Sequence, residues 1–150
     1  MNPDQIERET LIAAPVERVW SVLTEAEHIS AWFAQRGAEI DLRPGGALTM
    51  HFDGWPTSRA RGEEVEPPRR FVFRWTAHHA MPDEPAEGNS TRVEFTLTPD
   101  GEGTRLRVVE TGFASLATTP EGARKNYDDN VGGWKQVLEQ FAAHVSQVPA

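Results

Sequence analysis

Hydrophobic residues near the end of the chain recur with the period of a long α-helix. Between Pro120 and Val145, apolar side chains follow one another at steps of three and four residues, which places them on one helical face. They are Tyr127, Val131, Trp134, Leu138, Phe141 and Val145. Thr119 is suited to cap this helix. Gly132 and Gly133 destabilise a helix interior, so we expect either a bend there or a close approach to a sheet.

The middle of the chain alternates between apolar and polar residues, a pattern typical of half-buried β-strands. The alternation recurs near residues 38–42, 48–52, 71–76, 93–97 and 106–110, and residues 59–66 fit a polar strand. Pro-Gly-Gly, Asp-Gly and Pro-Pro sequences separate several of these segments as turns. Because sequential strands joined by short turns pair antiparallel, we predict an antiparallel sheet with one apolar face.

The first part of the chain predicts one strand and two short helices. Gln5–Ala13 fits the strand, Pro15 suits the start of the first helix, and Glu25–Phe33 fits the second. The apolar face of the sheet needs a cover, and the terminal helix is the one predicted element long enough to supply it. The predicted fold class is therefore α+β, in a single domain over residues 1–150.

Composition and charge exclude several classes of partner. The 150 residues carry a formal net charge of −8, and phosphate binding needs clustered Lys and Arg, so we expect neither nucleic acid nor an anionic membrane as partner. No apolar stretch approaches the ~20 residues of a membrane span. The polar, acidic N-terminus lacks the features of a signal peptide, and we expect a cytoplasmic protein. With no cysteine, the chain has neither disulfides nor thiolate ligands.

A set of short motifs, in a fixed order, resembles a known family. The segments are Ala14–Trp20, Trp32–Phe33, Asp41–Gly46, Pro67–Trp75, Gly103–Leu106 and Gly133–Leu138. Together they resemble the bacterial branch of the family named after the activator of heat-shock protein ninety ATPase, within the START-like (SRPBCC) superfamily. The resemblance, which runs from about Ile6 to Val145, implies a helix-grip fold: a curved antiparallel sheet around a long C-terminal helix, with a cavity between them. It implies no single function, because superfamily members bind lipids or hormones, catalyse cyclisations or act on chaperones.

Two kinds of residue are candidates for a ligand site in that cavity. The apolar candidates are Trp32, Phe33, Met50, Phe52, Phe73, Trp75, Phe95, Tyr127, Val131, Trp134 and Leu138. They can equally form a solid core, as large aromatic residues usually do. The polar candidate is Glu110, which shares the inward side of its strand with Leu106 and Val108. An inward carboxylate is destabilising unless paired, so Glu110 either anchors a pocket, reaches solvent or pairs with an arginine such as Arg61.

The patterns expected of metal or nucleophile chemistry are absent from the sequence. His78 and His79 point to opposite sides of an extended chain, while His28, His51 and His144 lack ligand spacing to one another. No nucleophile elbow, phosphate-binding loop or dinucleotide fingerprint occurs. We therefore predict no metal and no cofactor.

The sequence favours the binding of a small, mostly apolar molecule in the helix–sheet cavity, by a monomer or homodimer. One alternative is a co-chaperone-like protein that modulates the ATPase of a heat-shock chaperone, which rests on the family name alone. A second alternative is an enzyme of the cyclase or dehydratase type using the same cavity. Catalysis there would need a general acid or base, for which Glu110 and Tyr127 are the candidates. The absence of a catalytic motif favours binding over catalysis.

Overall fold

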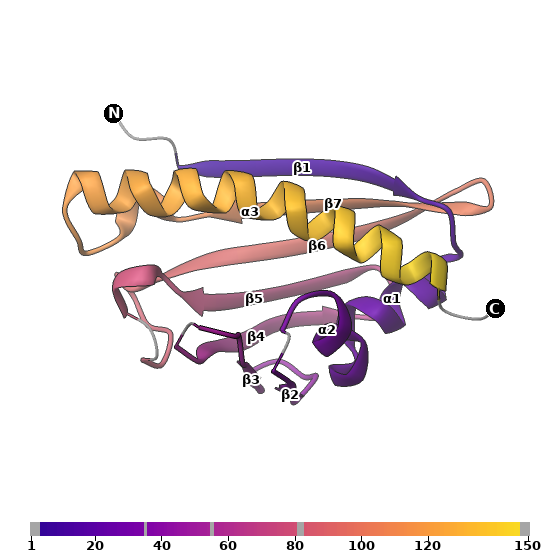
Figure 1. Ribbon diagram of the computed structural model, residues 1–150, viewed down its shortest axis with the longest axis horizontal. Coiled ribbons are helices and arrows are strands. Elements are labelled where there is room, and N and C mark those ends of the chain that lie inside the picture. Colours follow the sequence, from indigo (N-terminus) through magenta and orange to yellow (C-terminus); the bar gives the residue numbers. More distant parts are fainter. Residues whose placement is uncertain (1–3, 35, 55, 81–82, 148–150) are drawn as a thin grey trace.

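The computed structural model describes residues 4–34, 36–54, 56–80 and 83–147. It consists of one sheet and three α-helices (Figure 1). In order they are β1 (Gln5–Ile12), α1 (Val16–Thr24), α2 (Ala26–Trp32), β2 (Ala38–Ile40), β3 (Ala47–Met50), β4 (Ser58–Glu66), β5 (Arg70–Thr76), the 3-10 turn η1 (His78–Ala80), β6 (Ser90–Asp100), β7 (Gly103–Thr111), the 3-10 turn η2 (Phe113–Ser115) and α3 (Pro120–Gln147).

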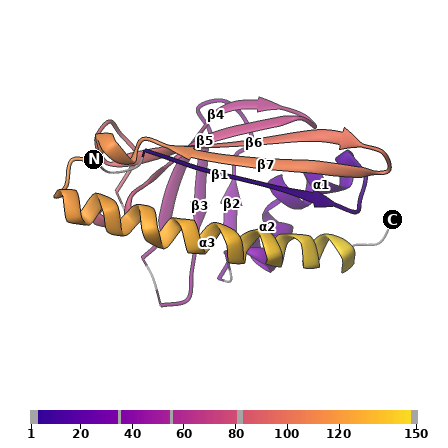
Figure 2. The ribbon, with the colours of Figure 1, turned by 90° about the horizontal axis from the view of Figure 1, so that it is seen from above.

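The strands form one seven-stranded antiparallel sheet, in the order β1-β7-β6-β5-β4-β3-β2. Strands β2 to β6 each pair with the next strand along the chain, as expected for an antiparallel sheet of consecutive strands. Strand β1 instead lies at the edge of the sheet opposite β2, where it pairs with β7. The sheet curves around α3, which lies along one of its faces (Figure 2). The helix-grip architecture predicted from the sequence is confirmed.

Helix α3 begins where the capping residues predict. The backbone N–H of Gly122 donates to Oγ1 of Thr119 at 3.0 Å, which satisfies one of the free donors in the first turn. The helix then continues unbroken for 28 residues. Its fully buried residues change along its length, from Ala123 and Asn126 near the start to larger apolar side chains later. The later residues are Trp134, Leu138, Phe141 and Val145.

Helices α1 and α2 cover the end of the sheet near the C-terminal half of α3 (Figure 1). The indole N–H of Trp32 in α2 donates to the backbone carbonyl of Val22 in α1 at 2.8 Å. Its ring meets Phe141 of α3 edge to face, with centroids 4.9 Å apart. These contacts lock the two short helices against the last turns of α3.

The outer face of the sheet carries cross-strand ion pairs. Arg70 on β5 contacts Glu64 and Glu66 on β4 and Glu94 on β6. Further along the same face, Arg107 on β7 pairs with Glu7 on β1. Neighbouring strands thus match opposite charges, and the face opposite α3 is polar.

Two segments differ from the sequence-based prediction. Strand β2 ends at Ile40, because the backbone then turns: the Arg43 N–H donates to the Asp41 carbonyl and the Gly46 N–H to the Arg43 carbonyl, both at 2.9 Å. Strand β6 begins at Ser90, earlier than alternation indicated, because it pairs with the end of β5. None of the described helices combines the length and hydropathy needed to cross a membrane.

Candidate functional site

The site is built around Glu110, a carboxylate enclosed by the fold. Along β7, the inward positions are Thr104, Leu106, Val108 and Glu110, and all four are buried. Glu110 has 0% exposure and lies opposite Val93 on β6 and Ile6 on β1. The inward orientation expected from strand alternation is therefore correct, and the interpretation of Glu110 as a solvent-reaching carboxylate is wrong.

Four neutral side chains donate hydrogen bonds to this carboxylate. Oε2 accepts from Nε1 of Trp75 at 2.9 Å and from Oγ1 of Thr91 at 2.5 Å. Oε1 accepts from Nε1 of Trp134 at 2.8 Å, and Nδ2 of Asn130 lies 3.0 and 3.1 Å from the two oxygens. Among the described residues, no cation pairs with Glu110, and Arg61 instead contacts Glu84 at 3.2 Å. The donors fill the acceptor positions of both carboxylate oxygens.

The carboxylate joins three parts of the fold. Trp75 comes from β5, Thr91 from β6, and Asn130 and Trp134 from α3. The rings of Trp75 and Trp134 stack with centroids 5.6 Å apart and planes 25° apart. Glu110 therefore holds the two indoles against each other and fixes α3 over the sheet.

A cleft of about 590 Å³ is lined in part by the four residues that donate to Glu110. Its apolar wall consists of Phe33, Phe52, Trp75, Trp134 and Val137. Its polar wall includes Ser58, Thr76, Thr91, Asn130 and Gln136. The cleft thus combines aromatic surface with neutral hydrogen-bonding groups.

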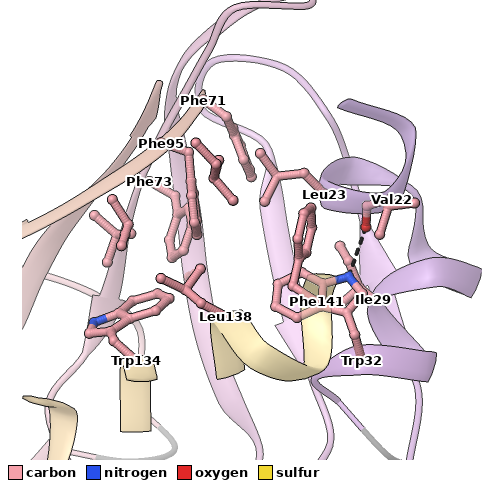
Figure 3. Close-up of a cluster of buried hydrophobic side chains, with 14 of the residues drawn as sticks. Val22, Leu23, Ile29, Trp32, Phe71, Phe73, Phe95, Trp134, Leu138 and Phe141 are labelled. Carbon is pink, nitrogen blue, oxygen red and sulfur yellow. Dashed lines mark hydrogen bonds between the residues drawn. The ribbon is translucent and has the colours of Figure 1, made fainter. Parts of the chain in front are cut away.

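The remaining space between helix and sheet is nearly filled. A void of about 30 Å³ lies among Trp32, Phe73, Phe95 and their neighbours, roughly the space of one water molecule. Figure 3 shows the buried side chains of this part, with Phe71, Phe73 and Phe95 of the sheet packed toward Leu138 and Phe141 of α3. This part of the helix–sheet layer is a solid core.

The structure distributes the predicted ligand residues over four environments. Phe33, Phe52, Trp75 and Trp134 line the cleft. Trp32, Met50, Phe73, Phe95 and Leu138 belong to the solid core. Tyr127 and Val131 are partly buried at the edge of the core, and the Tyr127 hydroxyl donates to the Gln5 carbonyl at 3.2 Å. Glu110 lies behind the cleft wall.

Sequence reasoning missed the polar residues that α3 contributes. Asn126, Asn130 and Trp134 are spaced by four, so they share one helical face, and this spacing was a signal available in the sequence. Asn126 and Asn130 were not predicted, because the apolar periodicity that predicted Trp134 does not mark polar residues. Polar residues on a buried helical face indicate a buried polar group opposite, and Glu110 is that group.

One of the two roles expected for the paired glycines of α3, a close approach to the sheet, is wrong. A Cβ atom added at Gly132 or Gly133 would meet nothing within 4 Å, so neither glycine permits a close approach to the sheet. Gly133 instead lines the cleft, whereas Gly132 does not. The lack of a side chain at Gly133 therefore keeps that part of the cleft open.

The cleft offers no ligand set for a metal ion within the described part of the chain. Asp129 is its one carboxylate there, and no histidine lines it. The side chain of His78, one of the histidines weighed in the sequence, lies outside the described residues.

Comparisons with known proteins agree with this fold. The sequence profile of the family described as "Activator of Hsp90 ATPase homolog 1-like protein" matches residues 13–146. None of the curated proteins with which the chain was compared matches it.

Solved structures with the same fold come from several bacteria. Protein MLL2253 from Mesorhizobium loti is 24% identical with a TM-score of 0.79, and the match covers 97% of this chain and 99% of that one. CalU16 from Micromonospora echinospora is 25% identical with a TM-score of 0.69, covering 95% and 76%. DynU16, a putative protein in the dynemicin biosynthetic locus, is 21% identical with a TM-score of 0.76, covering 96% and 48%.

Proposed function

The chain belongs to the family of Activator of Hsp90 ATPase homolog 1-like proteins, and from this premise we propose that it binds a small, mostly apolar molecule in the cleft beside α3. The observation that carries the proposal is the cleft of about 590 Å³, whose wall is held in place by a buried carboxylate. Ligand pockets in proteins commonly enclose about 300–1,000 Å³ and combine apolar walls with a few polar groups. The cleft has both properties.

Glu110 supports the site without contacting the ligand. Its exposure is 0%, and its oxygens already accept hydrogen bonds from Trp75, Thr91, Asn130 and Trp134. A ligand in the cleft therefore contacts the surfaces of these donor residues that do not face Glu110. In this account Glu110 positions the cleft wall, which differs from the direct anchoring role expected from the sequence.

Asn130 provides the acceptor that a ligand would meet. A carboxylate can only accept, so Glu110 must face the NH₂ group of the Asn130 amide, at 3.0 and 3.1 Å. The amide orientation is thereby fixed, and Oδ1 is available to accept a hydrogen bond from a ligand N–H or O–H. The hydroxyl of Thr76, in the same cleft, is buried and has no hydrogen-bond partner among the described residues.

The charges at the rim of the cleft favour a neutral ligand. Lys125 and Asp129 lie one helical turn apart on α3, and their side chains pair at 2.8 Å. Their charges compensate each other, and the deeper wall is neutral apart from Glu110, which is enclosed. The ligand class that fits best is a neutral aromatic or alicyclic molecule with one hydrogen-bond donor.

The two alternatives receive less support from the geometry. An enzyme would need an acid or base in contact with the bound molecule, but Glu110 is enclosed and the Tyr127 hydroxyl donates to a backbone carbonyl. A co-chaperone role rests on the description of the family. Stimulation of a heat-shock chaperone ATPase by the purified protein would support that role in place of ligand binding.

The two adjacent glycines of α3 provide a matched test. Gly133→Leu would place a side chain in the cleft, whereas Gly132→Leu would place one outside it, and an added Cβ meets no atom within 4 Å at either position. The probe is N-phenyl-1-naphthylamine, a neutral aromatic amine with one N–H donor, whose fluorescence rises in an apolar site. We expect saturable binding to the parent protein and to Gly132→Leu, and binding at least about tenfold weaker to Gly133→Leu, as one filled subsite implies.

Two results would contradict the proposal. The first is equal binding by both leucine variants, which would place the probe elsewhere on the molecule. The second is the absence of saturable binding to the parent protein. Circular dichroism of both variants confirms that a difference in binding does not arise from loss of the helix.

A further inference from the structure

Two histidines that are distant in sequence meet at the other end of the molecule. His28 lies on α2 and His144 in the last turn of α3, and they are 116 positions apart. Nδ1 of His28 and Nε2 of His144 are 3.0 Å apart. At this distance the two nitrogens form one hydrogen bond, in which one is protonated and donates to the lone pair of the other. When that proton is removed, both nitrogens direct a lone pair into the space between the rings.

Two glutamates lie beside His28. The carboxylates of Glu25 and Glu27 and a ring nitrogen of His28 all lie within 4.8 Å of one another, whereas His144 is not part of this cluster. Glu25 directly precedes α2 and makes no side-chain capping bond, and Glu27 is in the first turn. Both side chains are exposed, and neither forms an ion pair with another described residue. The carboxylates are therefore free to reorient toward the histidines.

We propose that His28 and His144, together with a carboxylate from Glu25 or Glu27, form a binding site for a divalent transition-metal ion such as Zn²⁺. Imidazole nitrogen and carboxylate oxygen are ordinary zinc ligands, at about 2.0–2.2 Å from the metal. Two tetrahedral ligands at that distance are separated by about 3.3 Å. The two imidazoles therefore need to separate by only a few tenths of an ångström to admit the ion.

The surroundings of His144 suit this role. His144 is partly buried, and its ring centroid lies 5.2 Å from that of His28. His144 also lies at the C-terminal end of a 28-residue helix, where the helix dipole favours a positive charge.

A metal ion here would connect the start of α2 to the end of α3, beside the solid core. None of the four residues lines the cleft, so this site and the proposed ligand site are independent. The sequence alone gave no sign of the pair, because no spacing rule joins residues 28 and 144. The fold brings them together, and the prediction of no metal is replaced by this proposal.

The test uses the full chain without an affinity tag, after removal of metal with a chelator. Zn²⁺ is titrated in competition with a chromophoric chelator, and we expect one equivalent to bind with micromolar or tighter affinity. His28→Asn and His144→Asn should each weaken binding by about tenfold or more, in line with the loss of one ligand. The double variant Glu25→Gln/Glu27→Gln, which keeps both imidazoles, should weaken it several-fold.

His51→Gln is the matched control. His51 also contacts a carboxylate, with Nε2 3.0 Å from Oε2 of Glu39, and it contacts the hydroxyl of Thr57, but none of the described imidazoles lies beside it. Zinc affinity should be unchanged in this variant. Equal weakening by His51→Gln and His144→Asn would overturn the proposal, because binding would then be distributed over surface histidines.

A measurement on the unsubstituted protein removes any dependence on how the variants fold. In two-dimensional NMR spectra of the histidine rings, Zn²⁺ should shift the signals of His28 and His144 together and leave those of His51 unchanged. Absence of saturable zinc uptake, or a shift of other histidines in place of these two, would contradict the assignment. Each outcome is separate from that of the cleft experiment, which contains no metal.

Discussion

The two halves of α3 pack against the same sheet differently, one closely and one with a cleft beside it. From Trp134 onward, its buried residues are large and apolar, and the space they share with the sheet contains a void of only about 30 Å³. Before Trp134, the inward face carries Asn126 and Asn130, and a cleft of about 590 Å³ opens beside it. One helix therefore closes the core at one end of the molecule and forms the wall of a cleft at the other.

The difference shows that the polar residues set the boundary of the core. Glu110 needs donors, and the α3 side chains that supply them are Asn130 and Trp134, so side chains without an N–H donor cannot replace them. At the closed end none of the described residues is a buried carboxylate that requires partners, and Leu138 and Phe141 interdigitate with the sheet aromatics (Figure 3). The packed core therefore lies at one end and the cleft at the other.

The largest expected effect comes from truncation in the closed half. Phe141 is 1% exposed, and Phe141→Ala should lower the free energy of unfolding by about 3–5 kcal/mol through lost contacts and a cavity. Val137, in the cleft wall and only partly buried, is the comparison, and Val137→Ala should lower it by less than about 1.5 kcal/mol. Urea denaturation monitored by circular dichroism measures both. Similar losses for the two variants would remove the distinction between the solid core and the cleft wall.

Glu110→Gln should have the next largest effect. The amide NH₂ of glutamine would face hydrogen-bond donors such as Trp134 or Trp75, leaving buried donors unpaired and lowering the free energy of unfolding by about 2–4 kcal/mol. Glu84→Gln is the control, since Glu84 makes ion pairs at the surface, and it should change stability by no more than about 0.5 kcal/mol. A Glu110→Gln protein as stable as the parent would show that the carboxylate does not organise the donors.

Alanine at the paired glycines should raise stability. Gly132→Ala and Gly133→Ala should each increase the free energy of unfolding by about 0.5–1 kcal/mol, because alanine is the better helix former and an added Cβ meets no atom within 4 Å at either position. Thermal unfolding provides the comparison. Destabilisation by Gly133→Ala alone would mean that the cleft wall tolerates no side chain, even in the absence of ligand.

The smallest expected effect concerns the ion pairs on the outer face of the sheet. A hydrogen bond from Arg70, opposed by burial and assisted by Arg92, lowers the pKa of Glu94 from its usual value of 4.5. A depressed folded-state pKa contributes stability above pH 4.5, and this contribution is lost as the pH falls through the folded-state value.

Glu94→Gln should therefore be less stable than the parent by about 0.5–1 kcal/mol at pH 7. The difference should disappear in acid, once Glu94 of the parent is protonated. Denaturation curves of both proteins between neutral and acid pH measure it. A difference that stays constant over this range would assign the effect of the substitution to packing.

The sequence revealed the framework of the molecule more fully than its site. The stripe from Trp134 to Val145 and the inward position of Glu110 followed from periodicity, because buried faces impose periods of 3.6 and 2 on the chain. The position of the cleft did not follow from periodicity. Whether aromatic residues fill the space between helix and sheet depends on how side chains from distant strands pack. Asn130 was missed for a related reason, since its role depends on a carboxylate on another element.

The indole N–H groups of three tryptophans test the difference between the halves most directly. Trp75 and Trp134 donate to Glu110 in the cleft wall, whereas Trp32 donates to the Val22 carbonyl within the solid core. Their ¹H–¹⁵N signals, assigned through Trp→Phe variants, are followed while N-phenyl-1-naphthylamine is added. Binding in the cleft should give saturable shifts for Trp75 and Trp134 and leave the signal of Trp32 unchanged. Equal shifts for Trp32, or no shift for any of the three, would contradict it.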